Sequence, residues 1–232
     1  MKKRKAFTLV EMMVALVIFS FMLMSMSSIY ITAEKHMFQN YRHDRMRTSL
    51  TSAMKFLKTT MAQASRIDSP VFGNNSNILA FASNVDPNGC YPIDGVAANS
   101  RWHYFCMTNC PAGYTGITPG YGTPQCLYYH TQAIAGGGGC PGGAAWNPGG
   151  AYPLTCGIQT RGAGETVTLL MPFVATPPNA PNFLFSRSGT LERNTVRAAI
   201  RLWWTPPVSL QNVSRPLDTT METYLSANMV SQ

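Results

Sequence analysis

The stretch Lys2-Lys3-Arg4-Lys5-Ala6-Phe7-Thr8-Leu9-Val10-Glu11 opens the chain and decides how the rest of it is organised. Its positive charges stop at Ala6, and a long apolar run follows from Met12 to Met24, with the carboxylate of Glu11 at its head. A carboxylate inside hydrocarbon costs about 2.5 kcal/mol or more, so such a residue usually has a specific partner. No Lys or Arg lies between Glu11 and Lys35. The partner must therefore come from outside the apolar run.

Cleavage of the chain between Ala6 and Phe7 would create that partner. The new α-amino group on Phe7 would be a positive charge about one helical turn from Glu11, which is the spacing at which groups on one face meet. A neighbouring copy of the chain could supply the same amino group. Either arrangement gives Glu11 a cation that the uncut sequence does not offer.

The residues Lys5-Ala6-Phe7-Thr8-Leu9-Val10-Glu11 resemble the processing motif of type IV prepilins and type II secretion pseudopilins. The resemblance implies that a prepilin peptidase/N-methyltransferase removes the basic leader 1–6 and methylates Phe7, and that Glu11 docks each subunit under its neighbour in a helical filament. One residue departs from the family pattern, because Ala6 stands where the family nearly always has Gly. Alanine is the nearest substitute in size, so cleavage is still expected.

The same resemblance implies the setting in which the chain works. Before assembly it would be a single-pass protein of the bacterial inner membrane with its head outside the cytoplasm. After assembly it would lie in a pilus or a periplasmic pseudopilus. Its partners would be other pilin or pseudopilin subunits and the inner-membrane assembly platform. Size and helix pattern look most like PilW-type minor pilins or J-type minor pseudopilins, so we expect a structural subunit that is incorporated into the filament or primes its assembly.

Two ordinary interpretations of the N-terminus compete with this one. The segment could be a plain signal anchor with Glu11 at the membrane interface, or a secretory signal cleaved near Ser25-Met26-Ser27. Neither explains why Thr8 and Glu11 interrupt the boundary between charge and apolar core. All three interpretations place the Lys/Arg cluster inside and the remainder of the chain outside.

The long segment from Phe7 to Arg66 contains neither Gly nor Pro. It predicts one continuous helix, roughly 90 Å long at about 1.5 Å per residue. Residues 7–30 are apolar all round and long enough to cross a bilayer, which takes about 20 residues. Residues 31–66 continue the helix with an apolar stripe on one side. The members of this stripe are Met46, Leu50, Met54, Leu57, Met61 and Ala64.

The remaining residues, 67–232, predict a single β-rich head. Strands are expected at 78–82, 102–106, 126–130, 166–174, 182–186 and 194–204, with either an edge strand or a helix near 220–225. Loops rich in Gly, Pro and Cys occupy 86–164. The fold class is therefore α+β, with the second half of the helix packed on an antiparallel sheet.

Six cysteines fall in the head, after the export signal: Cys90, Cys106, Cys110, Cys126, Cys140 and Cys156. An even number of cysteines in an exported chain predicts up to three disulfides, with fifteen pairings open. Cys140 and Cys156 are expected to tether the Gly-rich loop between them. A metal site is the weaker interpretation, because Cys106-x-x-x-Cys110 lacks a second cysteine pair and the head histidines complete no familiar zinc spacing.

Composition argues against most other functions. The chain has 232 residues, 18 Lys+Arg against 10 Asp+Glu, and only 12% charged residues. Half of the excess positive charge lies in the leader, so nucleic acid is an unsupported partner. We find no paired carboxylates, nucleophile elbow, metalloprotease or dinucleotide motif, and predict neither an enzyme nor a cofactor. The alternative function is a pilus-associated adhesin or DNA-capturing module, for which head arginines such as Arg187, Arg197 and Arg201 could contact phosphate; a solvated strand face is the more ordinary role for them.

Overall fold

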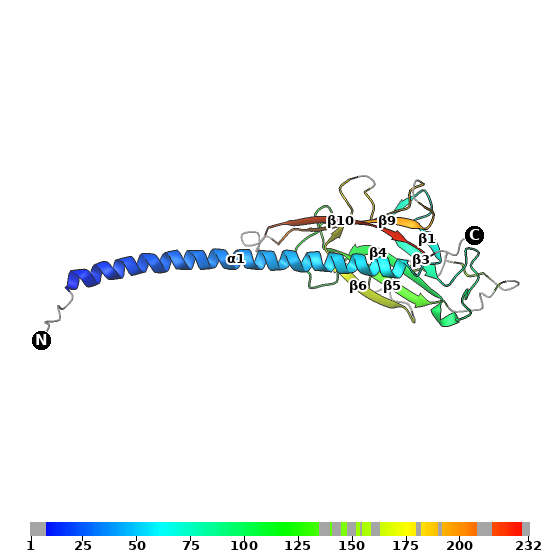
Figure 1. Ribbon diagram of the computed structural model, residues 1–232, viewed down its shortest axis with the longest axis horizontal. Coiled ribbons are helices and arrows are strands. Elements are labelled where there is room, and N and C mark those ends of the chain that lie inside the picture. Colours follow the sequence, from blue (N-terminus) through cyan, green and yellow to red (C-terminus); the bar gives the residue numbers. More distant parts are fainter. Residues whose placement is uncertain are drawn as a thin grey trace. The chain divides into compact units, whose positions relative to one another are not determined.

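The computed structural model describes residues 8–134, 140, 145–147, 152–153, 155–158, 163–179, 182–189, 192–207 and 215–228. The leader 1–6 and Phe7 lie outside this set. The elements in chain order are α1 (Leu9–Met61), β1 (Arg66–Ser69), β2 (Asn75–Ser76), β3 (Leu79–Ser83), a 3₁₀ turn (Ala97–Asn99), β4 (Arg101–Asn109), β5 (Gln125–Ala133), β6 (Thr166–Pro172), β7 (Val174–Ala175), β8 (Phe185–Ser186), β9 (Thr195–Trp204) and β10 (Leu217–Ser226) (Figure 1). One long N-terminal helix followed by antiparallel strands confirms the predicted α+β class.

The chain divides into two compact units, one ending at Asp44 and the other beginning at Arg45. The described part of the first unit is the N-terminal portion of α1. The second unit contains the rest of α1 and all the strands. The hydrophobic core of the protein belongs to this second unit.

The helix ends at Met61, earlier than the predicted end at Arg66. Around Met61 the backbone hydrogen bonds join residues three apart, as in a 3₁₀ helix: Gln63 N–H donates to the Thr60 carbonyl and Ala64 N–H to the Met61 carbonyl. Ser65 then leaves the helical path, because its backbone N–H donates to the Ala82 carbonyl at 2.9 Å and its Oγ accepts the Val85 N–H at 2.9 Å. Pairing with β3 therefore ends the helix, and no Gly or Pro is needed to do so.

The strands form two antiparallel sheets, where the sequence had predicted one. The first has the order β1-β3-β4-β5-β6, and the second has the order β10-β9-β8-β2 with β7 also paired to β9. Figure 1 shows β9 and β10 apart from the group β4, β5 and β6. The predicted strand 166–174 is interrupted at Phe173, which has a positive φ of 59°. This break lets β6 pair with β5 in the first sheet and β7 with β9 in the second.

The main core joins the apolar stripe of α1 to one face of each sheet. The predicted stripe is confirmed, since Leu50, Met54, Leu57, Met61 and Ala64 are buried and Met46 is partly buried against them. Residues from the first sheet in the same cluster include Leu79, Phe81, Phe105, Leu127 and Met171, and those from the second include Phe185, Val196, Ala198, Ile200 and Leu202.

A second hydrophobic cluster covers the opposite face of the first sheet. Its buried members include Ala80, Ala82, Trp102, Tyr104, Cys106, Cys126 and Tyr128, with Trp146, Tyr152 and Cys156 of the loops packed against them. Strands β4 and β5 are therefore buried on both faces. That burial explains why large apolar and aromatic side chains occur on both faces of these strands, without the alternation of a half-exposed strand.

Candidate functional site

Glu11 closes a capping box at the start of α1. Thr8 immediately precedes the first helical residue, Leu9, and so occupies the N-cap position. The Thr8 backbone N–H and the Thr8 hydroxyl each donate to Oε2 of Glu11 at 2.9 Å. In return, the Glu11 N–H donates to Thr8 Oγ1 at 3.3 Å. This reciprocal arrangement is what a Thr-x-x-Glu sequence favours at a helix start, because it satisfies N–H groups that have no partner in the helix.

The capping box fixes the carboxylate at the positive end of the helix dipole. Both Thr8 hydrogen bonds go to Oε2. The other oxygen, Oε1, can therefore accept a further donor without loss of the cap. The arrangement can thus hold an ammonium group against a carboxylate that is already oriented.

Sequence reasoning placed Glu11 at this site but missed the role of Thr8. The signal was present, because Thr8-Leu9-Val10-Glu11 has the spacing of a capping box. The two other predicted site residues, Ala6 and Phe7, lie outside the described residues. Their roles in cleavage and methylation stay predictions.

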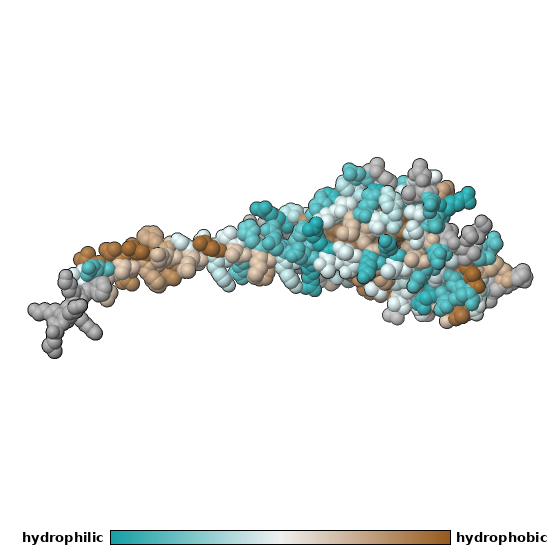
Figure 2. Space-filling view, viewed as in Figure 1, coloured by the Kyte–Doolittle hydropathy of each residue, from teal (hydrophilic) through white to brown (hydrophobic). Residues whose placement is uncertain are grey.

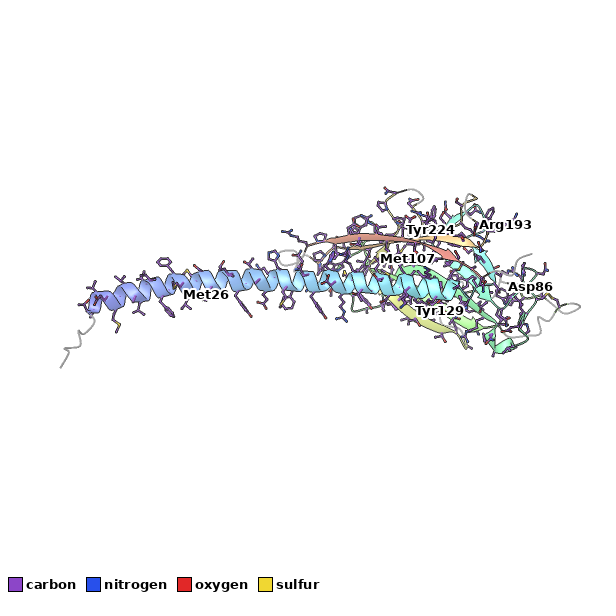
Figure 3. The ribbon with its side chains drawn as sticks, in the orientation of Figure 1. Met26, Asp86, Met107, Tyr129, Arg193 and Tyr224 are labelled. Carbon is purple, nitrogen blue, oxygen red and sulfur yellow. A yellow bond between two sulfur atoms is a disulfide. The ribbon has the colours of Figure 1, made fainter. Side chains whose placement is uncertain are left out.

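The surface of α1 that follows Glu11 is apolar and exposed. From Leu9 to Tyr30 the only charged residue is Glu11, and Figure 2 shows brown, hydrophobic atoms gathered over this part of the helix. The large side chains here are all exposed, including Met26, which projects from the helix in Figure 3. The helix is long and apolar enough to cross a membrane, and none of its most apolar window is buried.

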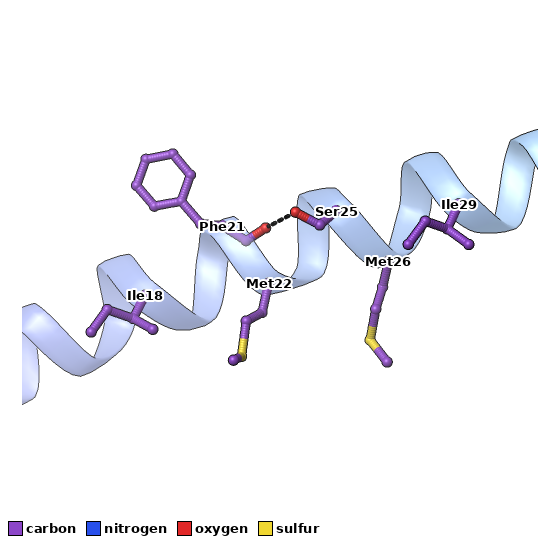
Figure 4. A pocket seen from close by; sticks show the side chains of 6 residues that line it. All are labelled: Ile18, Phe21, Met22, Ser25, Met26 and Ile29. Atoms are coloured by element: carbon purple, nitrogen blue, oxygen red, sulfur yellow. Dashed lines mark hydrogen bonds between the residues drawn. The ribbon is translucent and has the colours of Figure 1, made fainter.

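Two serine hydroxyls within this apolar segment are satisfied by the helix itself. Ser20 Oγ donates to the Leu16 carbonyl at 2.8 Å, and Ser25 Oγ donates to the Phe21 carbonyl at 2.9 Å. A shallow groove lies alongside this second bond (Figure 4). Its lining residues are Ile18, Phe21, Met22, Ser25, Met26 and Ile29. Between Met12 and Met24 this surface therefore offers mainly hydrocarbon and thioether to whatever covers it.

All six predicted cysteines form disulfides. The pairs are Cys90–Cys140, Cys106–Cys156 and Cys110–Cys126. Two of them confirm the expected tethers, because Cys140 and Cys156 attach the loops after β5 to the segment before β4 and to β4 itself. The sequence alone could not choose among the fifteen pairings, since the choice depends on how the loops fold back over the first sheet.

A polar cleft in the head is lined by Gln63, Ser83, Asn84, Ala98, Asn99, Arg101 and His103. Its His103 contacts Ser83 Oγ at 3.3 Å through Nε2 and the Tyr129 hydroxyl at 2.7 Å through Nδ1. Burial, with the charge of Arg101 nearby, lowers the pKa of His103 to about 4. The hydrogen-bonding partners of the ring are thus hydroxyls, and no carboxylate among the described residues orients it as a catalytic base.

The arginines considered for phosphate binding make contacts inside the head. Arg187 is buried and donates to the carbonyls of Ile67 at 3.3 Å and Pro70 at 3.4 Å. Arg197 forms a two-pronged pair with Glu222, and Arg201 does the same with Asp218. These contacts on β9 and β10 give no specific support to a DNA-capturing head.

The comparisons with known proteins agree with the geometry at the N-terminus. Residues 1–27 match the family model of the prokaryotic N-terminal methylation motif. This match supports the resemblance to type IV prepilins and type II secretion pseudopilins, and a pilin-like subunit as the function. Proteins with this motif are in general structural. Neither the curated proteins nor the solved structures include a match to the chain.

Proposed function

We propose that this chain is a minor pilin or pseudopilin of a type IV pilus or a type II secretion-like filament. It is incorporated into the filament, or primes its assembly, through its N-terminal helix after the leader is removed between Ala6 and Phe7. The observation that carries the proposal is an oriented carboxylate, Glu11, at the head of an exposed apolar helix inside a methylation motif.

The mechanism begins with the covalent change at the N-terminus. A prepilin peptidase cuts before Phe7, and methylation of the new amino group keeps it basic. The amino group of one subunit then pairs with Glu11 of its neighbour. Because Oε2 is held by Thr8, the incoming ammonium is received by Oε1, and the capping box stays closed. A buried ion pair is stable only when its geometry is good and its remaining hydrogen bonds are made, and the cap provides that geometry.

Extraction from the membrane follows from the apolar surface of α1. Before assembly, lipid covers the side chains between Leu9 and Tyr30. In the filament, helices of other subunits replace the lipid. Because lipid and side chains are similarly apolar, the hydrophobic effect does not drive this exchange, and close packing between helices favours it. The many methionines of this segment suit irregular contacts between helices, since thioethers adapt their shape. The head stays outside the membrane, where its disulfides form.

A position beneath another subunit fits the presence of Glu11. A subunit at the very tip has no neighbour above it, so a docking carboxylate would serve no purpose there. We therefore place the chain below at least one other subunit, with the assembly platform acting on it from the inner membrane.

Substitution of Glu11 tests the docking role. Glu11→Ala should leave membrane insertion unchanged and lower incorporation into the filament fraction by about a hundredfold or more, because loss of one member of a buried ion pair costs about 3–5 kcal/mol. The matched control is Glu34→Ala, which removes an exposed glutamate of the same helix and should incorporate normally. Quantitative blotting of membrane and sheared filament fractions measures both. Equal incorporation of the two variants would refute the docking role.

A further inference from the structure

A buried histidine–glutamate pair lies beside one of the disulfides. Nδ1 of His130 contacts the carboxylate of Glu165, and the two side chains have exposed fractions of only 0% and 5%. A ring nitrogen of His130 and the Sγ atoms of Cys106 and Cys156 all lie within 4.8 Å of one another. Within the described ranges, this is the one such group of three side chains close enough to hold a metal ion.

The first sheet brings these groups together from separate parts of the chain. In the register of β4 with β5, Tyr104 lies opposite His130 and Cys106 lies opposite Tyr128. Cys106 and His130 are therefore diagonal neighbours on the same face. Glu165 directly precedes β6, whose Val167 pairs with His130. Cys156 reaches the same face from the loop that packs over it.

The contacts of the imidazole leave one nitrogen suited to a metal. Nδ1 is committed to Glu165. Nε2 accepts only a long hydrogen bond, 3.4 Å, from the Gly157 backbone N–H. A histidine whose second nitrogen is held by a carboxylate is the usual form of a metal-binding histidine, because the carboxylate fixes the ring and strengthens it as a ligand. Two cysteine thiolates and one histidine form an established zinc ligand set with a fourth position open.

We propose that Cys106, Cys156 and Nε2 of His130 bind a divalent, thiolate-preferring metal ion such as Zn²⁺ when the Cys106–Cys156 disulfide is reduced, with Glu165 as the positioning residue. A dithiol or phosphine reductant supplies the two electrons, and each sulfur takes up one proton. The metal ion then displaces both protons and binds the two thiolates. Tetrahedral ligands at about 2.0–2.3 Å from zinc lie about 3.5 Å from one another. After reduction, the two sulfurs must therefore move apart and the ring nitrogen must move toward them, each by roughly 1 Å.

The proposal distinguishes this disulfide from the other two. Cys90–Cys140 and Cys110–Cys126 belong to no comparable cluster within the described residues. Metal should therefore protect one cysteine pair selectively, even after all three disulfides are reduced. This selectivity does not depend on the chain being a pilin, and the experiment below measures it separately.

The first experiment uses the full chain in detergent, reduced with a phosphine without oxygen, and adds Co²⁺ as a spectroscopic stand-in for Zn²⁺. A thiolate-to-cobalt absorption band at one Co²⁺ per chain, removed by stoichiometric Zn²⁺, is expected. The double variant Cys110→Ser/Cys126→Ser should keep the band. His130→Gln should lose it, and Glu165→Gln should weaken Co²⁺ binding about 10- to 100-fold while the band keeps its shape. An unchanged band in His130→Gln would overturn the assignment.

The second experiment needs no variant, so a folding defect cannot obscure it. The reduced wild-type chain is alkylated with and without Zn²⁺, and the modified cysteines are identified by peptide mass spectrometry. Zn²⁺ should slow alkylation of Cys106 and Cys156 at least tenfold and leave the other four cysteines unchanged. If Zn²⁺ left the alkylation rates of Cys106 and Cys156 unchanged, or protected a different pair of cysteines, the proposal would be contradicted.

Discussion

At Thr8, the hydroxyl supplies one of the two hydrogen bonds that hold the carboxylate of Glu11, for which we propose a docking role. The capping box holds Glu11 through Oε2 and leaves Oε1 for an incoming ammonium. Thr8→Val keeps the shape of the side chain but removes the hydroxyl. The backbone N–H of residue 8 still donates to Oε2, but both bonds of the hydroxyl are lost. We expect this loss to cost about 1 kcal/mol, which corresponds to roughly a fivefold loss of filament incorporation. Thr8→Ser should restore incorporation in the same assay, and a Thr8→Val chain that incorporates as well as wild type would show that the cap plays no part.

The neutral state of His103 makes the head sensitive to acid. Its pKa is lowered from 6.5 to about 4 by burial and by Arg101. As the pH falls between these values, the unfolded chain binds a proton that the folded chain does not, so stability decreases. The loss amounts to about 3 kcal/mol by pH 4, and this group contributes little further change once the pH is well below 4.

Urea unfolding at several pH values, followed by Trp fluorescence with the disulfides intact, measures this effect. His103→Gln keeps a hydrogen-bonding side chain but cannot titrate, so its stability should fall less between pH 6.5 and pH 4. His36→Gln removes an exposed histidine of α1 and should behave like wild type. Parallel profiles for wild type and His103→Gln would rule out His103 as the group responsible.

At the scale of elements, the second part of α1 acts as a core element of the head. Leu57 is fully buried in the cluster that joins the helix to both sheets. Leu57→Ala should lower the free energy of unfolding by about 2–5 kcal/mol, because it removes buried methyl groups and leaves a cavity. Lys58→Ala, on the exposed side of the same turn, should change it by less than about 0.5 kcal/mol. Similar losses for both variants in urea unfolding would contradict the assigned packing.

Periodicity predicted the helix and its stripe well, because burial on one side repeats with the helical turn. It could not predict where α1 ends, since the hydrogen bonds of Ser65 go to residues of β3 and beyond. It also missed β1 and β2, which are short and owe their shape to pairing. The strand 166–174 was predicted as one element, and only the backbone break at Phe173 divides it between two sheets.

At the scale of the whole molecule, the class of fold could be predicted from the sequence, as could Glu11 and the six cysteines as residues of interest. Glu11 was identified because a charge in an apolar run needs an explanation, and the cysteines because an even set after an export signal indicates disulfides. The pairing of those cysteines, the second sheet and the His130–Glu165 pair all depend on contacts between distant segments. No local pattern encodes such contacts, so they could be found only in the folded structure.

The central claim is that proteolysis creates the cation that Glu11 is positioned to meet. The direct test is the intact mass and N-terminal sequence of this chain, purified from native membranes and from a sheared filament fraction. We predict a chain that begins at Phe7, lacks Met1 to Ala6, and carries one methyl group on its amino terminus. A chain that keeps its lysine-rich leader, or begins near Ser28, and is absent from the filament fraction would contradict the account.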